Sequence, residues 1–111
     1  MEIEVKEQGT HVAIVELKGR LDMLTAVDLK QRLATVVADG RNRLVIDLAN
    51  VDFVDSSGLG ALISGLKAAR VAGGDLRLAQ LTKQVRYILE VSTLDRVLRP
   101  YVTVQEALSG Y

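Results

Sequence analysis

One short run of residues constrains the fold more than any other part of the chain. Leu44, Val45 and Ile46 follow one another within the segment Arg43 to Leu48, with no polar residue between them. A strand with one face in water alternates apolar and polar side chains, whereas a strand covered on both faces does not need to. The run therefore predicts a buried strand in a parallel sheet that helices cover.

Helical periodicity precedes this strand. Between Thr25 and Asp39 the apolar residues recur at the spacing of one helix face. Thr25, with Asp28 three residues later, resembles a capping box, so we expect the first helix to begin there. Gly40 stands where such a helix is expected to end. The buried stripe of this helix is predicted to comprise Leu29, Leu33, Val36 and Val37.

A second helix is predicted from about Ser57 to Ala72, ended by Gly73-Gly74. Two interior glycines, Gly60 and Gly65, cost about 1 kcal/mol each relative to alanine. Close packing against a neighbouring helix explains them, and so does a smooth face on which a partner docks; the pattern does not decide between these. The expected inward stripe is Leu59, Leu62, Ile63 and Leu66, while Gly60, Ala61, Ser64, Gly65 and Ala68 are expected on other faces.

The remaining segments complete an alternation of strands and helices. Alternating residues over Met1 to Glu7 and His11 to Lys18 predict a hairpin that turns at Gly9-Thr10. Strands alternating with helices imply right-handed βαβ units. We therefore expect an α/β fold, one domain over residues 1–111, with a mixed, mostly parallel sheet, an N-terminal hairpin and about four helices. The later elements are strands at Asp75 to Gln80 and Tyr101 to Val104, and helices at Lys83 to Val91 and from Thr103 to Leu108.

Composition excludes several classes of function. The 14 basic and 14 acidic side chains balance, so no overall field draws the chain to nucleic acid or to an anionic membrane. We expect no membrane insertion. The absence of cysteine excludes disulfides, zinc–thiolate sites and thiol nucleophiles. No signal-peptide pattern and no apolar stretch of roughly 20 residues occur, so we expect a cytoplasmic location. We expect no cofactor, no metal and no enzymatic activity.

One segment carries functional information: Asp55-Ser56-Ser57-Gly58-Leu59-Gly60 follows the buried strand and opens the second helix. Helix N-termini favour an anion by roughly 0.3–1 kcal/mol, so two hydroxyls stand where a phosphate is tolerated. The aspartate and serines also suit a simple N-cap. A nucleotide site or a serine hydrolase is disfavoured, because no phosphate-binding or GxSxG motif is present and His11 is the sole imidazole.

Gly19-Arg20-Leu21-Asp22 precedes Thr25-Ala26, the buried strand continues into Asp47-Leu48, and the Asp55 segment follows. Taken in this order, these motifs resemble those of the STAS domains of bacterial anti-sigma-factor antagonists. The resemblance implies that Ser56 is a phosphoacceptor, with Ser57 as the runner-up. It places Asp22 and the start of the second helix on the partner-facing region. The partner-binding residues it implies are Asp22, Asp55, Ser56, Ser57, Gly58, Leu59 and Gly60.

The same resemblance implies the partners. Family members bind an anti-sigma factor that is also a serine kinase of the histidine-kinase-like ATPase class, and a PP2C-type phosphatase restores the unphosphorylated form. Direct contact with nucleic acid is not expected. Two alternatives stay open: a scaffold, transporter or stressosome accessory without sigma-factor control, and a nucleotide-binding domain. A phosphate at Ser56 would add about −1.5 to −2 charges, which predicts a local surface switch rather than unfolding.

Overall fold

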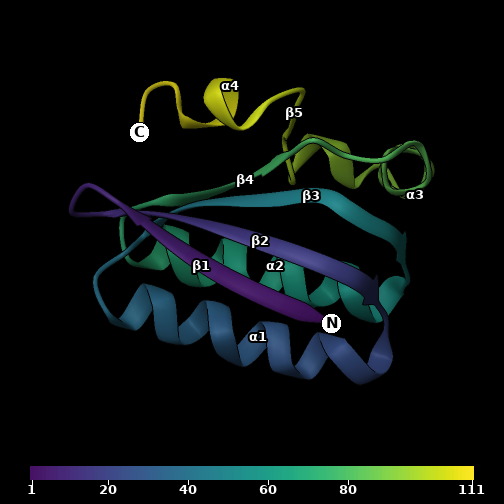
Figure 1. The fold of residues 1–111 in the computed structure, drawn as a ribbon, viewed down its shortest axis with the longest axis horizontal. Coiled ribbons are helices and arrows are strands. Elements are labelled where there is room, and N and C mark those ends of the chain that lie inside the picture. The colour runs from purple at the N-terminus through teal and green to yellow at the C-terminus, as the bar shows by residue number, and fades with distance from the viewer.

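A single five-stranded sheet forms the framework of the computed structural model, which describes residues 1–111. Its strands lie across the sheet in the order of the sequence, and the first pair is antiparallel while the other pairs are parallel. This confirms the predicted mixed sheet with an N-terminal hairpin (Figure 1). The strands are β1 (Glu2–Gln8), β2 (Val12–Leu21), β3 (Arg43–Val54), β4 (Asp75–Ala79) and β5 (Pro100–Tyr101).

Helices cover the two faces of this sheet unequally. The long helices α1 (Met23–Ala38) and α2 (Ser56–Val71) lie side by side against one face, and the short α4 (Val104–Leu108) lies on the other (Figure 1). The helix α3 (Lys83–Val91) packs against β3, and a 3-10 turn at Leu94–Arg96 follows it. None of these helices has the length and apolar character that crossing a bilayer requires.

The core lies between the sheet and the α1–α2 layer. Alternate residues of β2 and β3 point toward α1 and α2 and are fully or almost fully buried: Ala13, Val15 and Leu17 from β2, and Leu44, Ile46 and Leu48 from β3. Burying a leucine or isoleucine side chain contributes about 1.5–3 kcal/mol. Val45 points to the opposite face, where it is buried against Ala79 and Ala107. The run Leu44–Ile46 is therefore covered on both faces, as predicted.

A cluster at the C-terminus fastens α4 to the sheet. The Arg77 guanidinium lies 4.0 Å from the Tyr111 ring centroid and 5.5 Å from that of Tyr101. It donates hydrogen bonds to the carbonyl oxygens of Ala107 (2.8 Å) and Ser109 (2.7 Å). The Tyr111 hydroxyl donates to the Leu44 carbonyl oxygen at 3.0 Å, and burial raises the pKa of that hydroxyl. These contacts tie the last residues to the amino-terminal end of β3.

The predicted first residue of α1 and the predicted capping pair are both wrong. The helix begins at Met23 rather than Thr25, and its N-cap is Asp22. The capping box exists, but it pairs Asp22 with Thr25 instead of Thr25 with Asp28. Thr25 is thus the third residue of the helix, and its hydroxyl serves the cap from inside. The predicted end holds, since the C-cap is Asp39 and Gly40 follows with a φ of +96°.

Other differences concern strand ends. β3 does not stop at Leu48 but continues to Val54, past two register shifts in its pairing with β2. The last strand is Pro100–Tyr101 rather than Tyr101 to Val104, because pairing with β4 ends at Tyr101 and Thr103 already caps α4. Thr103 caps α4 as predicted, its hydroxyl oxygen accepting from the Glu106 amide at 3.0 Å.

Candidate functional site

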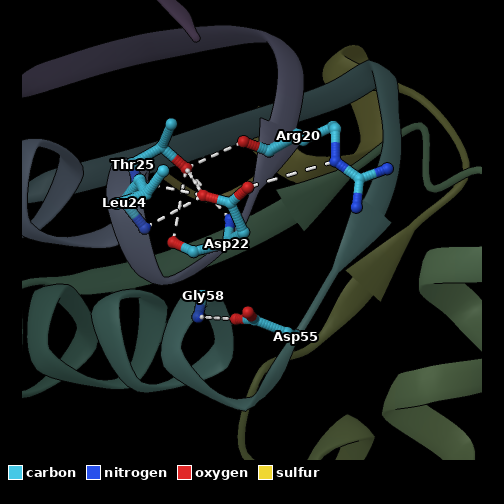
Figure 2. A network of polar contacts seen from close by, with 6 residues as sticks. All are labelled: Arg20, Asp22, Leu24, Thr25, Asp55 and Gly58. Carbon is cyan, nitrogen blue, oxygen red and sulfur yellow. Dashed lines mark hydrogen bonds and ion pairs between the residues drawn. The ribbon is translucent and has the colours of Figure 1, made fainter.

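Two helices begin at the same edge of the sheet. β2 leads into α1 through Asp22, and β3 leads into α2 through Asp55. Because β2 and β3 are parallel, their carboxyl ends meet, and the Asp55 amide donates to the Leu21 carbonyl oxygen at 3.1 Å. Figure 2 shows the two aspartates at these neighbouring helix starts. Asp22 and the residues that follow Asp55 therefore share one rim, as the sequence predicts.

The start of α1 is closed by reciprocal hydrogen bonds (Figure 2). The Asp22 Oδ1 accepts from the amides of Leu24 (3.0 Å) and Thr25 (3.2 Å). The Thr25 hydroxyl oxygen accepts from the Asp22 amide at 3.0 Å, and that hydroxyl donates to the Arg20 carbonyl oxygen at 2.8 Å. The Thr25 amide, more than any other group, holds the pKa of the Asp22 carboxyl below its ordinary value.

Arg20 adds one positive charge to the same rim. Its guanidinium lies 4.0 Å from the centroid of the Phe53 ring, and its Nε lies 4.0 Å from the Asp22 Oδ2. The stacking holds the guanidinium over β3, while most of the Arg20 side chain stays exposed. Its charge therefore remains available at the rim.

The start of α2 has a simpler cap. Asp55 has an extended backbone, and its Oδ1 accepts one hydrogen bond, from the Gly58 amide at 2.9 Å. No side chain of the first turn returns a bond to the Asp55 amide, which pairs with Leu21 instead. Ser56 is the first residue of the helix and is exposed, whereas Ser57 is half-buried. The cap thus fixes the helix start without engaging either serine hydroxyl.

Gly58 determines how closely α2 approaches β2. A Cβ atom on this buried glycine would lie 2.5 Å from the Leu21 carbonyl oxygen and 2.7 Å from the Leu21 Cγ. Contacts this short are not possible, so glycine is required for the first turn of α2 to lie against the end of β2. The sequence suggested that small residues here leave backbone amides uncovered, whereas the structure uses Gly58 for close packing.

The other glycines of α2 divide between the two explanations that the sequence left open. A Cβ atom on Gly65 would meet the Leu33 Cδ1 at 2.5 Å, so Gly65 serves the packing of α2 against α1. Gly60 is exposed and has nothing within 4 Å of such an atom. The prediction that Ala61 and Gly65 lie off the inward face is wrong, because both are buried, and Ile63 is only partly so. Packing therefore explains Gly65, and an open surface lies at Gly60.

This open surface is one wall of a groove of about 340 Å³ between the first halves of α1 and α2. Sequence reasoning missed its α1 side, because Met23 and Val27 are exposed apolar residues that fall off the buried stripe. The available signal was the run Met23-Leu24 directly after the cap, where apolar side chains had no expected core position. The groove is lined by Met23, Ala26, Val27 and Lys30 of α1, and by Ser57, Gly60 and Ala61 of α2.

His11 lies at the opposite end of β2 from this rim. Its Nδ1 is 3.3 Å from the Gly40 carbonyl oxygen, in the region of the β1–β2 turn. No three histidine, cysteine, aspartate or glutamate side chains converge as metal ligands would. The chemistry that the rim offers is therefore that of exposed hydroxyls, capping carboxylates and a helix N-terminus.

The fold and this rim together define a STAS domain. The family model described as STAS domain matches residues 2–107, and the chain belongs to that family. Anti-sigma-F factor antagonist RsfB of Mycobacterium tuberculosis is 32% identical over 101 residues, which cover 89% of this chain and 80% of RsfB.

Solved structures have the same fold. The crystal structure of an anti-sigma factor antagonist from Mycobacterium paratuberculosis has a TM-score of 0.86 at 30% identity, covering 97% of this chain and 91% of that one. The anti-sigma factor antagonist SpoIIAA in its unphosphorylated form has a TM-score of 0.82 at 19% identity, covering 96% and 93%. At that identity the second likeness concerns the fold alone.

Proposed function

We propose that this chain is an anti-sigma factor antagonist, a protein-binding switch that sequesters an anti-sigma factor while Ser56 is unphosphorylated. The proposed partner is also the serine kinase of the histidine-kinase-like ATPase class that modifies Ser56, and a PP2C-type phosphatase reverses the modification. The chain itself performs no catalysis in this scheme. Residues 1–111 act as one STAS domain in the cytoplasm and so regulate sigma-factor-dependent transcription.

The observation that carries this proposal is the exposure of Ser56 at the first position of α2. A kinase must reach the hydroxyl that it modifies, and Ser56 is exposed while Ser57 is half-buried. The Gly58 amide donates the capping hydrogen bond to the Asp55 carboxylate, so a phosphate on Ser56 breaks no hydrogen bond of the helix start. These features favour Ser56 over Ser57 as the acceptor. The names of the relatives support the partner class.

The electrostatics of the rim support release by phosphorylation. A phosphoserine carries about −1.5 to −2 charges, and the helix N-terminus offsets only about 0.3–1 kcal/mol of their cost. Asp55 precedes Ser56, and Asp22 caps the neighbouring helix. These two carboxylates against the one guanidinium of Arg20 leave the rim negative before the dianion is added. Burying it under a partner without basic groups costs several kcal/mol, and each 1.4 kcal/mol weakens binding about tenfold.

The test uses three variants and the purified anti-sigma factor. Ser56→Asp is expected to remain folded and to lose binding by at least about 100-fold, which corresponds to nearly 3 kcal/mol. Ser56→Ala is expected to bind and to resist release by ATP. Ser57→Ala serves as the matched control: it should bind the anti-sigma factor and still be released by ATP. Intact-mass analysis after incubation with the kinase and ATP is expected to give one phosphate on the wild type and on Ser57→Ala, and none on Ser56→Ala.

Two results would contradict the proposal. A phosphate mapped to Ser57 or Ser64 would remove the assignment of the acceptor. A complex that persists with Ser56→Asp would favour a constitutive scaffold without phosphate control. Circular dichroism of Ser56→Asp tests the local nature of the switch, because a large loss of helix would mean that the phosphate acts through unfolding.

A further inference from the structure

The groove between α1 and α2 opens beside the proposed phosphoacceptor. Each helix contributes one face to it: Met23, Ala26, Val27 and Lys30 follow the spacing i, i+3, i+4 and i+7 on α1. Ser57, Gly60 and Ala61 follow i, i+3 and i+4 on α2. Met23 and Ser57 lie next in sequence to Asp22 and Ser56, so one end of the groove begins at the rim.

The walls and the floor of this groove suit an apolar side chain. Leu24, just outside it, is 84% exposed, and Met23 and Val27 are 68% and 62% exposed. The α2 wall is nearly featureless at Gly60, where a Cβ atom would meet nothing within 4 Å. A cluster of exposed apolar residues next to an unfilled recess is typical of a protein-interaction surface rather than of free protein surface.

Charge is placed at the far end of the groove. Lys30 stands two turns along α1 from Met23, about 10 Å away at 1.5 Å per residue. Its ammonium group takes part in none of the ion pairs of the protein, which involve Lys6, Arg20, Arg41, Arg70 and Arg77. The groove therefore presents apolar surface at the rim and one unpaired positive charge at its other end.

Beyond the first turn of each helix, the backbone of both walls is unavailable for recognition, because amides and carbonyls within helices bond to one another. A partner thus engages the length of this groove through side chains, which is the mode of an amphipathic helix lying in a groove. We propose that the groove receives an amphipathic helix of the anti-sigma factor, with an aliphatic anchor packed on Met23, Val27 and Gly60 and an acidic group facing Lys30. This inference rests on the proposed function and names the surface that binds the partner.

The location of the groove explains how a phosphate on Ser56 acts on it. A helix that fills the recess covers Ser57 and passes over the start of α2, where Ser56 is exposed. The phosphate then lies at the end of the apolar contact instead of at its centre. The aliphatic anchor in the groove then provides the binding affinity, and phosphorylation of Ser56 controls whether the partner stays bound.

The central experiment is calorimetric titration of the purified anti-sigma factor with the full chain and its Gly60→Leu variant. The leucine fills the groove without meeting any atom at its Cβ and replaces a helical glycine, so the variant should be at least as stable as the wild type. Binding is expected to weaken by at least about 100-fold. Urea unfolding of the same variant separates blocked docking from misfolding.

Matched surface variants extend the test. Val27→Ser is expected to weaken binding about tenfold, while Val71→Ser, at a 90% exposed position near the other end of α2, should leave it unchanged. Lys30→Glu is expected to weaken binding about tenfold at low salt and less at high salt. Arg32→Glu reverses a charge on the same helix outside this groove, and it should have no comparable effect.

The outcomes separate this inference from the proposed function. Wild-type affinity in Gly60→Leu, together with lost binding in Ser56→Asp, would contradict docking in the groove, whereas the proposed switch at Ser56 would stand. Failure of the wild type to bind the anti-sigma factor would overturn both. Concentration-dependent dimers that Gly60→Leu abolishes would assign the groove to a second copy of the chain and would also overturn the inference.

Discussion

The starts of α1 and α2 resemble each other in everything except their closure. Both helices have 16 residues, both follow a strand of the same parallel pair, and both are capped by an aspartate with an extended backbone. The Asp22 carboxylate accepts hydrogen bonds from two amides, and the Asp22 amide donates one to the Thr25 hydroxyl oxygen, whereas the Asp55 carboxylate accepts a single bond. In α2 the residue corresponding to Thr25 is Gly58, which has no side chain to accept a bond from the Asp55 amide.

The two helix starts differ in whether the cap uses a hydroxyl group of the first turn. In α1 the first turn uses its own hydroxyl, that of Thr25, to close the cap. In α2 the glycine lets the helix pack against Leu21, and that packing, rather than a second hydrogen bond, fixes the start. The two serines are thereby left outside the cap. A helix start can thus be rigid without using every polar side chain that it carries.

The largest expected effect comes from a substitution that disrupts the packing of Gly58 against Leu21. Gly58→Ala places a Cβ atom 2.5 Å from the Leu21 carbonyl oxygen, so α2 must move away from β2. We expect a loss of about 2 kcal/mol in the free energy of unfolding, the usual cost of overpacking a tight contact. Gly60→Ala is the matched control, and it should gain up to about 1 kcal/mol through helix propensity. Equal urea midpoints for the two variants would contradict the role of Gly58.

The caps themselves provide the next largest effect. Asp55→Ala removes one capping bond and should cost about 1 kcal/mol. Asp22→Ala removes two bonds from backbone amides to the carboxylate, so its loss should be the greater of the two. Thermal or urea unfolding of both variants measures the order. If Asp55→Ala proves the more destabilising, the closure of α1 contributes less than its geometry indicates.

The smallest expected effect is a difference in acid stability. The pKa of Asp22 in the folded protein is lowered, chiefly by the Thr25 amide, from an ordinary value of 3.8. A lowered pKa stabilises the fold above that ordinary value, and the contribution is lost as the pH falls through the folded pKa. Asp22→Asn keeps a capping side chain without titrating. Unfolding midpoints below pH 3.8 should therefore fall more steeply for the wild type than for Asp22→Asn.

Most of the architecture follows from patterns in the sequence. The run Leu44–Ile46 predicts the central strand, and the limits predicted for α1, α2 and α3 lie within about two residues of those observed. The end of β3 could not be predicted, because Asp47, Asn50 and Asp52 interrupt the apolar pattern while the strand continues through shifts in register. The short β5 was misplaced since two residues give no periodicity.

At the candidate site, residue types were easier to predict than geometry. The Asp55 segment and Asp22 were identified from their motifs, and their meeting at one rim follows from parallel strands. The sequence predicts a capping box at Thr25 and allows Asp22 to be a turn residue or a cap, because both residues are good caps and only the backbone distinguishes them. The groove escaped prediction because it depends on which sides of two helices face each other, and Met23 and Val27 lie off the buried stripe.

The order of the strands has a consequence for synthesis on the ribosome. Every strand of this sheet pairs with the strand that precedes it in the chain, so each new strand meets a neighbour that has already emerged. The residues of the rim and the groove lie between Arg20 and Ala61, ahead of β4, β5 and the Arg77 cluster. The half of the molecule that carries the candidate site is therefore translated first, and the contacts of Arg77 with Tyr101 and Tyr111 form last.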